Sequence, residues 1–365
     1  MAQSLRPSVA PNLPIGPVEY DQRYQDQFLN ALRLYFRELD NFTQVLMANN
    51  GGRFVSFPNG SFYDTSTQYD GSTTIPYAIR FNSTSISQGV SITSRDFVGT
   101  GSIALTVLTI TAVTSGRMYP SNLLSGTGVS AGTYSFLQLS STATPIAGTQ
   151  SYVSGGAIGA TSFVVSGGSG NIEPRQFVSG TGVPANTRVV SAVFNPSTGN
   201  TTVELSAAFT VQASGNYVFR PWGYEGTYSV SPSQTVASTT ITGTLPSLIT
   251  FEYSGLYKIQ FSLQFSNTDN NIIHEVDVWF KQNDVDIPDS NSRFSIPGRH
   301  SGLNGQLIAA LDFFVEAQAG DVVEIMWHTD SSTVFIETIP AATNPIRPQT
   351  PSSIVTVQFV SELPE

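Results

Sequence analysis

The clearest helical signal in the chain lies between residues 20 and 48, where apolar side chains recur every three or four positions. The successive spacings are 4, 3, 4, 3 and 4, which is the a/d seam of a heptad repeat. Asn49 and the residues after it, Asn and two Gly, favour the left-handed conformation that ends a helix. We therefore expect one N-terminal helix within residues 20–50. Its predicted seam consists of Phe28, Leu32, Tyr35, Leu39, Phe42 and Leu46.

This helix has two interpretations. It could pack on a β-domain of its own chain, or several copies could form a short oligomerising bundle. Three heptads are short for a free-standing coiled coil, so a bundle would need support from an attached oligomeric head. The pattern alone leaves both alternatives open.

Alternation of apolar and polar residues, which is typical of half-buried strands, dominates two separate stretches, residues 53–96 and 223–362. β-branched and aromatic residues are frequent there, and turn residues interrupt the alternating runs. Several short strands at such intervals indicate an all-β sandwich, here a jelly roll. The runs that carry this prediction are 77–81, 90–92, 257–265, 275–280, 322–327 and 354–360.

An internal repeat occupies the stretch between them, residues 97–222. Ser-Gly-Thr-Gly-Val stands at 125–129 and again at 179–183, an offset of 54, and flanking Gly, Pro, Ala and Thr residues match at the same offset. The match predicts two copies of a small all-β unit with glycines at its turns. A phosphate loop would need a following Gly-Lys-Ser/Thr and a helix, so we interpret these glycines as turn residues. They are Gly126, Gly128, Gly180 and Gly182.

The patterns together predict four parts: an extended arm over residues 1–19, the helix within 20–50, a jelly roll built from 53–96 and 223–362, and the β-repeat module 97–222 inserted into it. The arm holds four prolines, which make it stiff but leave it without a core. It could be a disordered tail or an arm that becomes ordered on a partner.

Composition excludes several classes of site. The chain has no cysteine, so disulfide scaffolds, thiolate zinc sites and cysteine nucleophiles are ruled out. Its net charge is −10, with only two lysines, Lys258 and Lys281, and this argues against binding the phosphates of nucleic acid. Charged residues are rarest in the repeats, with six among the 124 residues from 96 to 219.

The N-terminal residues lack the apolar core of a signal peptide, and no stretch approaches the roughly 18 apolar residues of a membrane helix. We therefore expect no membrane insertion, and assembly in a cytoplasm.

Residues suited to catalysis or metal binding are few. The histidines His274, His300 and His328 stand in no catalytic spacing. The acidic loop 283–289 lacks the central Gly and terminal Glu of an EF-hand. We predict no catalytic residue, no metal site and no cofactor. The aromatic residues that could stack on sugars, or more simply fill the core, are Trp222, Tyr224, Trp279 and Trp327.

Four segments near the C-terminus resemble a known family. They are Gly255-Leu-Tyr-Lys-Ile-Gln-Phe-Ser-Leu-Gln264, Val276-Asp-Val-Trp-Phe-Lys-Gln-Asn283, Ala319-Gly-Asp-Val-Val-Glu-Ile-Met-Trp327 and Ile354-Val-Thr-Val357. They are similar to a C-terminal domain of virion structural proteins of tailed phages, marine cyanophages in particular. The resemblance implies the trimeric jelly roll of tumour-necrosis-factor and complement-head type.

Two further segments extend the resemblance. Residues 1–50 are similar to the N-termini of phage virion proteins, through Leu13-Pro-Ile15, Tyr20-Asp-Gln-Arg-Tyr24 and Leu32-Arg-Leu-Tyr-Phe36. Family members begin the jelly roll with strands like Tyr77-Ala-Ile-Arg-Phe-Asn82 directly before the Gly255 segment, whereas about 160 residues separate the two in this chain. The repeat module therefore looks like an insertion.

The resemblance implies a structural component of a tailed-phage virion. We expect a homotrimeric, fibre- or spike-like protein attached to other virion proteins, in the portal, neck, tail or capsid, through its N-terminal arm and helix. A host-surface glycan or protein is a further expected partner. One alternative is a capsid or neck decoration protein without receptor binding. Another is a glycan-degrading tailspike-type enzyme, which would need a carboxylate pair that the sequence does not single out.

Overall fold

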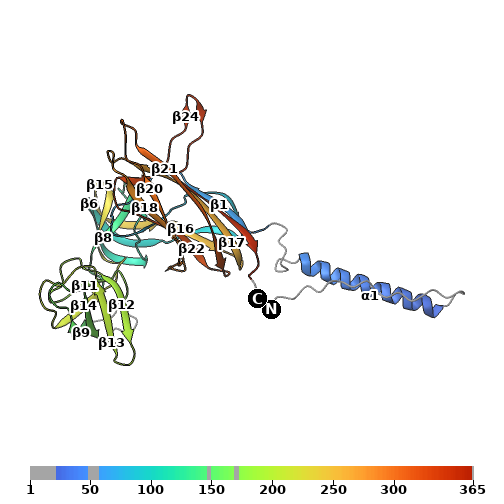
Figure 1. Cartoon of the computed structure of the whole chain (residues 1–365), viewed down its shortest axis with the longest axis horizontal. Coiled ribbons are helices and arrows are strands. Elements are labelled where there is room, and N and C mark those ends of the chain that lie inside the picture. The colour runs from blue at the N-terminus through green and yellow to red at the C-terminus, as the bar shows by residue number, and fades with distance from the viewer. Residues whose placement is uncertain (1–21, 48–56, 146–148, 168–171, 364–365) are drawn as a thin grey trace.

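The computed structural model describes residues 22–47, 57–145, 149–167 and 172–363, and for residues 41–47 it describes the backbone only. The described chain is mostly β-strand, with the single helix α1 (Gln22–Met47) near the N-terminus. This confirms the predicted fold class, a jelly-roll-like β-sandwich with inserted β-units and one N-terminal helix. Figure 1 shows α1 extending away from the sheets. The predicted arm, residues 1–19, lies outside the described residues.

Two sheets form the sandwich, and in both of them strands from the beginning of the chain pair with strands from its end. The first sheet has the order β1 (Asn59–Asp64), β26 (Ser353–Ser361), β17 (Gly255–Asn267), β23 (Val334–Ile336), β2 (Gln68–Tyr69), with β21 (Gly305–Ala317) also pairing with β17. The second has the order β19 (Val285–Asp286), β18 (His274–Gln282), β22 (Val322–Thr329), β16 (Pro246–Phe251), β5 (Val90–Ser94), with β20 (Ser292–Ile296) beside β18 and β3 (Tyr77–Ala78) beside β22. Outside these sheets, β4 (Ser83–Gln88) runs beside β1, and β24 (Ala342–Thr343) pairs with β25 (Ile346–Arg347) in a hairpin that protrudes in Figure 1.

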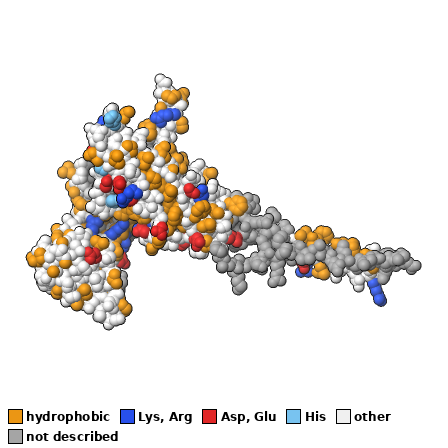
Figure 2. Space-filling model, in the orientation of Figure 1, with side chains coloured by type: hydrophobic (Ala, Val, Ile, Leu, Met, Phe, Trp, Pro, Cys, Tyr) orange, Lys and Arg blue, Asp and Glu red, His pale blue; other side chains and the backbone are white. Residues whose placement is uncertain are grey.

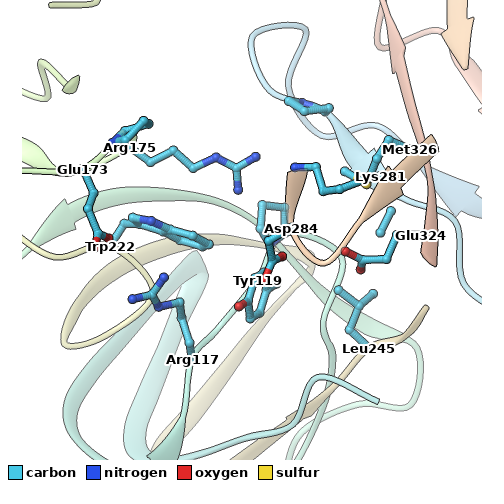
Figure 3. Close-up of a pocket in the computed structure, with 14 residues that line it drawn as sticks. Arg117, Tyr119, Glu173, Arg175, Trp222, Leu245, Lys281, Asp284, Glu324 and Met326 are labelled. Atoms are coloured by element: carbon cyan, nitrogen blue, oxygen red, sulfur yellow. The ribbon is translucent and has the colours of Figure 1, made fainter. Parts of the chain in front are cut away.

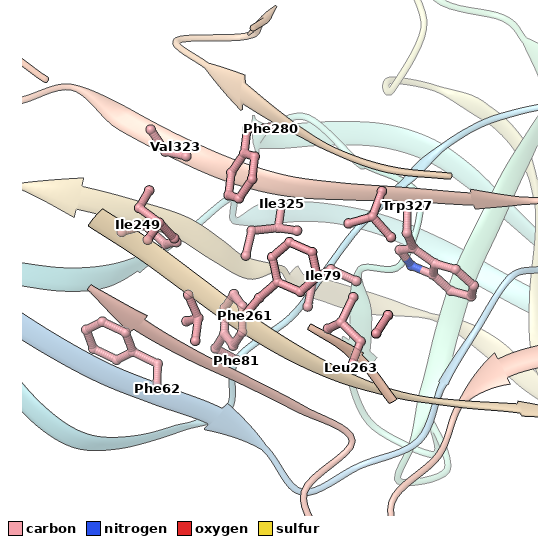
Figure 4. Packing of buried hydrophobic residues seen from close by; sticks show 14 of the residues in the cluster. Phe62, Ile79, Phe81, Ile249, Phe261, Leu263, Phe280, Val323, Ile325 and Trp327 are labelled. Atoms are coloured by element: carbon pink, nitrogen blue, oxygen red, sulfur yellow. The ribbon is translucent and has the colours of Figure 1, made fainter. Parts of the chain in front are cut away.

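The sandwich core forms where the alternating apolar residues of the two sheets face each other (Figure 4). Phe261 and Leu263 on β17 share this core with Ile325 and Trp327 on β22, and all four are at most 1% exposed. The rings of Phe261 and Phe280 have centroids 5.9 Å apart. Burying each such side chain stabilises the fold by about 1.5–3 kcal/mol. The alternation therefore determines which face of each strand points inward.

The segment 77–81 connects the sandwich to the insertion. It was predicted as one alternating strand, but β3 covers only its first two residues. Ile79 and Phe81 still enter the sandwich core. Arg80 is buried on the other side, with its guanidinium carbon 4.2 Å from the ring centroid of Tyr134 in the insertion. Both faces of this segment are thus covered, one by the sandwich and one by the insertion.

The insertion consists of two β-units, each with its own buried core. We name them the outer repeat, residues 97–141 with 226–244, and the inner repeat, residues 149–220. The outer repeat has the order β6 (Phe97–Gly116), β15 (Gly226–Thr244), β7 (Leu123–Ser125), β8 (Thr133–Ser141), with β8 also pairing with β15. The inner repeat has the order β11 (Phe177–Ser179), β14 (Asn216–Arg220), β9 (Thr149–Gly155), β10 (Ser162–Ser166), β13 (Asn200–Leu205), β12 (Val189–Asn195).

Strand β15 corrects the predicted boundary between the module and the jelly roll. We expected the jelly roll to resume at residue 223, but β15 pairs with β6, with Gly226 opposite Ile110 and Gly243 opposite Phe97. The jelly-roll sheet resumes only at Pro246, where β16 begins. An alternation of Ser, Thr and Val suits either sheet, so the pattern could not assign β15 before its pairing partner was known.

The inner repeat interrupts the outer repeat. In the inner repeat, Asn195 pairs with Asn200 across a tight turn between β12 and β13. The residue equivalent to Asn195 at the offset of 54 is Ser141, which pairs with Gly226. In the outer repeat, residues 142–225 connect the two paired strands at this position, and they contain the whole inner repeat. In the inner repeat, the equivalent connection is only a short turn. The second copy of the unit lies inside a hairpin of the first.

Candidate functional site

A cavity of about 350 Å³ lies where the jelly roll, the outer repeat and the inner repeat meet (Figure 3). Ala78 and Met326 line it from the jelly roll, Tyr119 from the outer repeat and Arg175 from the inner repeat, while Trp222 follows the inner repeat in the chain. Figure 2 shows basic and acidic side chains gathered near this junction, whereas the visible surface of the inner repeat carries few charges. We name this space the junction cavity.

Arg95 anchors the base of the insertion beside this cavity. It lies between β5 and β6, and its guanidinium donates two hydrogen bonds to Glu324, at 3.2 and 2.7 Å. It also donates to Asp284 at 2.5 Å and to the Tyr119 hydroxyl at 3.1 Å. Burial by itself lowers the pKa of Arg95, but the hydrogen bonds and charge of Glu324 outweigh it and raise the pKa. A buried ion pair with this many hydrogen bonds compensates its own desolvation, so Arg95 ties the outer repeat to β22.

Trp222 lies between two arginines. The guanidinium carbons of Arg117 and Arg175 are 4.7 and 5.0 Å from its ring centroid, and Figure 3 shows the indole between them. Arg117 is also 5.2 Å from the ring of Tyr224, and Tyr119 packs edge-on against Trp222 at 5.3 Å. Cation–π contacts contribute about 0.5–2 kcal/mol each. This stack joins the outer repeat to the inner repeat.

The two arginines of the stack differ from Arg95 in their partners. Within the described part of the chain, neither Arg117 nor Arg175 forms an ion pair with a carboxylate. Burial lowers the pKa of Arg175, because its charged form loses water, and the charges of Asp286, Asp284 and Glu324 offset this loss only in part. The pKa of the neighbouring Arg188 is also lowered, first by burial and then by the charge of Arg175. The inner repeat thus presents a half-buried positive charge to the cavity.

The charged groups of the lining are two arginines, one lysine and three carboxylates. The described lining residues include no histidine, serine or threonine, so a hydroxyl nucleophile with a histidine base is missing from them. Two of the carboxylates, Asp284 and Glu324, are occupied by Arg95, and the third belongs to Glu173, which is exposed.

The predicted seam residues lie in α1, outside this cavity. The core clusters of described buried residues contain no residue of α1. Leu29 and Phe36, which flank the seam, are 45% and 55% exposed. Phe42 and Leu46 belong to α1, but their side chains are outside the described residues. The seam side chains that are described are half-buried: Phe28, Leu32, Tyr35 and Leu39.

The first pair of predicted repeat glycines lies at equivalent turns. The carbonyl oxygen of Gly126 accepts the amide of Val129 at 3.1 Å, and that of Gly180 accepts the amide of Val183 at 3.2 Å. A Cβ on Gly180 would lie 2.3 Å from the Tyr217 ring, so this turn has no room for a side chain.

The second pair, Gly128 and Gly182, adopts the left-handed conformation with φ of 83° and 81°. Glycine is favoured there because it has no Cβ to collide with the following carbonyl. A Cβ on Gly182 would lie 2.4 Å from the carbonyl oxygen of Val211, whereas one on Gly128 would meet nothing closer than 3.7 Å. Both glycines shape turns, and neither lines the junction cavity.

The histidines and the acidic loop form polar contacts of their own. His274 lies between Asp269 and Asp330, with nitrogen–oxygen distances of 3.0 Å to each. Asp286 accepts the indole N–H of Trp279 at 2.8 Å. Among the described residues, no group of three or more His, Asp or Glu side chains is arranged to hold a metal ion.

Sequence reasoning did not identify Arg117 or Arg175 as site residues, and it named Trp222 only as one of four aromatic residues that could stack on sugars or fill the core. One signal for the two arginines was available. Half of the six charged residues in the sparsely charged stretch, namely Arg117, Glu173 and Arg175, line the junction cavity. These three charges mark positions where the repeats meet another part of the chain.

Two of the aromatic residues that could stack on sugars, Trp327 and Trp279, pack against apolar residues of the fold instead. Trp327 is a core residue at 1% exposure, and Trp279 packs against the small cluster that includes Ala78 and Met326.

A search of the described helix finds no segment with the length and apolar character needed to cross a membrane. Comparison of the chain with protein-family models and with curated proteins gives no match.

Proposed function

We propose that this chain is a homotrimeric structural protein of a tailed-phage virion, fibre- or spike-like, held to the particle by its N-terminal arm and helix. The observation that carries the proposal is the apolar stripe of α1. Leu29 and Phe36 remain 45% and 55% exposed beside a half-buried seam, and the described core clusters include no residue of the helix. An amphipathic helix gains most of its stability by burying its apolar face. Other copies of the same helix supply the missing surface in a trimer.

The outer face of the first jelly-roll sheet supports the same association. Ile308 and Phe314 on β21 are 63% and 52% exposed. Phe314 pairs across the strands with Lys258 on β17, which forms an ion pair with Asp312 at 2.9 Å. Large apolar side chains among a few paired charges are typical of surfaces that symmetric oligomers bury.

The proposed trimer has two kinds of expected partner, one at each end. The N-terminal segment would contact other virion proteins, in the portal, neck, tail or capsid, and the β-units would face outward toward a host-surface glycan or protein. The proposed role is attachment and architecture, in the virion after assembly in the host cytoplasm. It includes no catalysis, no cofactor, no nucleic-acid contact and no membrane insertion.

Mass photometry and sedimentation of the full chain test the oligomer. We expect a particle of three times the chain mass of 39.1 kDa, and a weaker trimer when residues 1–50 are deleted. A variant lacking only residues 1–19 separates the arm from the helix and should keep the trimer. A full chain that stays monomeric at micromolar concentration would contradict the proposal.

Two further measurements separate the alternatives. Saturable binding in a glycan array or to host cells indicates a fibre tip, whereas a decoration protein gives none. Release of reducing ends from the host's surface polysaccharide would indicate a tailspike-type enzyme and would contradict a purely structural role.

A further inference from the structure

Two cationic side chains point toward each other across the junction cavity. Figure 3 shows the guanidinium of Arg175, from the inner repeat, directed toward the ammonium group of Lys281, from β18. The Lys281 side chain is only 16% exposed, and its ion-pair contact is at 3.7 Å to Asp286, a residue that is itself 64% exposed. Like charges that face each other in a half-buried space repel, because little water is present to screen them.

The charges of Asp284, Asp286 and Glu324 favour the charged form of Arg175, but they offset its burial only in part. Asp284 and Glu324 both bind Arg95, at 2.5 and 2.7 Å, so their charge is already shared. Arg175 instead has Trp222 as its partner at 5.0 Å, and an aromatic ring compensates a charge less fully than a carboxylate does. The lowered pKa of Arg175 agrees with this, since burial outweighs every nearby negative charge.

Apolar residues form one wall of a space large enough for a small molecule, and Arg117, Tyr119 and Glu173 complete the lining. Ala78, Leu245 and Met326 contribute from the jelly roll, and Pro120 and Pro174 from the two repeats. The volume of about 350 Å³ falls within the range of small-molecule sites. Cations placed above an apolar wall suit a ligand with one anionic group and an uncharged body.

We propose that the junction cavity binds a small organic anion of the size of a sugar phosphate or sugar acid. Its phosphate or carboxylate lies between Arg175 and Lys281, and its uncharged body rests on Ala78 and Met326. Because the jelly roll and the inner repeat each supply one of the two cations, the bound anion also holds these two units together. The proposal concerns one chain and does not depend on the proposed trimer.

Isothermal titration of the full chain with glucose 6-phosphate, galacturonate, inorganic phosphate and neutral glucose tests the site. We expect saturable binding of one glucose 6-phosphate or galacturonate per chain, weakened by added salt, and none of glucose. Arg175→Asn and Lys281→Met should each weaken binding by about tenfold or more, since each removes a charge-assisted contact. Asparagine is chosen because Arg175 has a φ of 73°, a left-handed conformation that asparagine tolerates.

Arg347→Gln is the matched control, because Arg347 is an exposed arginine on β25 and lies outside the cavity lining. It should leave the affinity unchanged. Circular dichroism checks that each variant is folded, and if one of the two cavity variants does not fold, the other decides the outcome. The proposal is overturned if neither glucose 6-phosphate nor galacturonate saturates a site below about 10 mM, or if both cavity variants bind as the parent does. Equal affinity for inorganic phosphate and glucose 6-phosphate would overturn the role assigned to the apolar wall.

Discussion

Ser121 and Arg175, which are 54 positions apart, share one backbone conformation, with φ of 72° and 73°. The amide of Ser121 donates to the carbonyl oxygen of Ser135 at 2.7 Å, and the amide of Arg175 donates to that of Val189 at 2.8 Å. Both partners are also 54 positions apart. The two repeats are therefore copies in backbone detail, while the side chain at this position differs. In the inner copy it is the arginine that reaches the junction cavity.

The nested arrangement predicts that the inner repeat can be removed. Replacing residues 142–225 by Pro-Ser-Thr-Gly, which joins Asn195 to Asn200 in the inner repeat, should give a folded protein. Ser141 and Gly226 pair as Asn195 and Asn200 do, so the same turn fits. We expect a cooperative thermal transition for the shortened chain, measured by calorimetry. It should come at a lower temperature than in the parent, because the Trp222 stack is lost.

A second deletion variant, in which β15 is shifted by one residue, is the control. Joining the same turn to Thr227 instead of Gly226 shifts β15 by one residue and turns Tyr228 and Val230, 3% and 2% exposed, toward the wrong face. That variant should not fold. If both shortened chains fold equally well, or neither does, the prediction that the inner repeat can be replaced by this turn is wrong.

The equivalent glycines Gly128 and Gly182 form a matched pair for substitution by alanine. Both have positive φ, so each substitution should cost about 1–2 kcal/mol of unfolding free energy from the left-handed conformation alone. Gly182→Ala should cost about 2 kcal/mol more, because its Cβ would lie 2.4 Å from the carbonyl oxygen of Val211. Calorimetry of the two variants measures the difference. Equal destabilisation would show that the inner turn relaxes freely.

Asp70 makes the stability depend on pH. Its side chain is almost fully buried at 3% exposure, and burial raises the pKa from 3.8 to about 6. The folded state therefore holds a proton that the unfolded state releases between these two values. Stability from this group is highest below pH 3.8, falls as the pH rises, and is lowest above pH 6. Asp70→Asn should remove this slope and raise the free energy of unfolding at pH 7 by about 1–3 kcal/mol.

Asp277→Asn tests a carboxyl group whose pKa is shifted in the direction opposite to that of Asp70. Two hydrogen bonds from Arg293, both of 3.0 Å, lower the pKa of Asp277. Its contribution to stability is present at neutral pH and is lost in acid. The variant should therefore be less stable than the parent at pH 7. Urea unfolding between pH 3.8 and pH 7 measures the free energy of unfolding of the parent and of both variants. Parallel plots of this free energy against pH for Asp70→Asn and the parent would contradict the prediction for Asp70.

Leu39→Asp tests whether α1 is the seam of the proposed trimer. A carboxylate from each copy would meet on one axis, with a cost of about 3 kcal/mol or more for each desolvated charge. We expect mass photometry to show weaker trimers. Leu34→Asp is the control, since Leu34 is 53% exposed and lies off the seam, and it should leave the trimer intact. An intact trimer with Leu39→Asp would mean that α1 is not the seam.

Much of the local structure could be predicted from the sequence. The heptad spacing predicted α1, which extends over Gln22–Met47, and the alternation in 257–265 predicted β17. The recurrence of Ser-Gly-Thr-Gly-Val predicted two equivalent turns, and these adopt matching conformations at Gly128 and Gly182. These features depend on residues that are close in the chain. The steric and hydrogen-bonding preferences of such residues are independent of the rest of the fold.

The tertiary structure alone decided which strands share a sheet and which charges meet. The Ser, Thr and Val pattern of β15 is compatible with either sheet, and only its pairing with β6 placed it in the outer repeat. Arg117, Arg175 and Trp222 come from three separate segments and form one stack only because the two repeats pack against each other. Strand pairing and cavities depend on cross-strand neighbours far apart in the sequence. A pattern of period two specifies a strand and its buried face, but it does not specify the strand's partner.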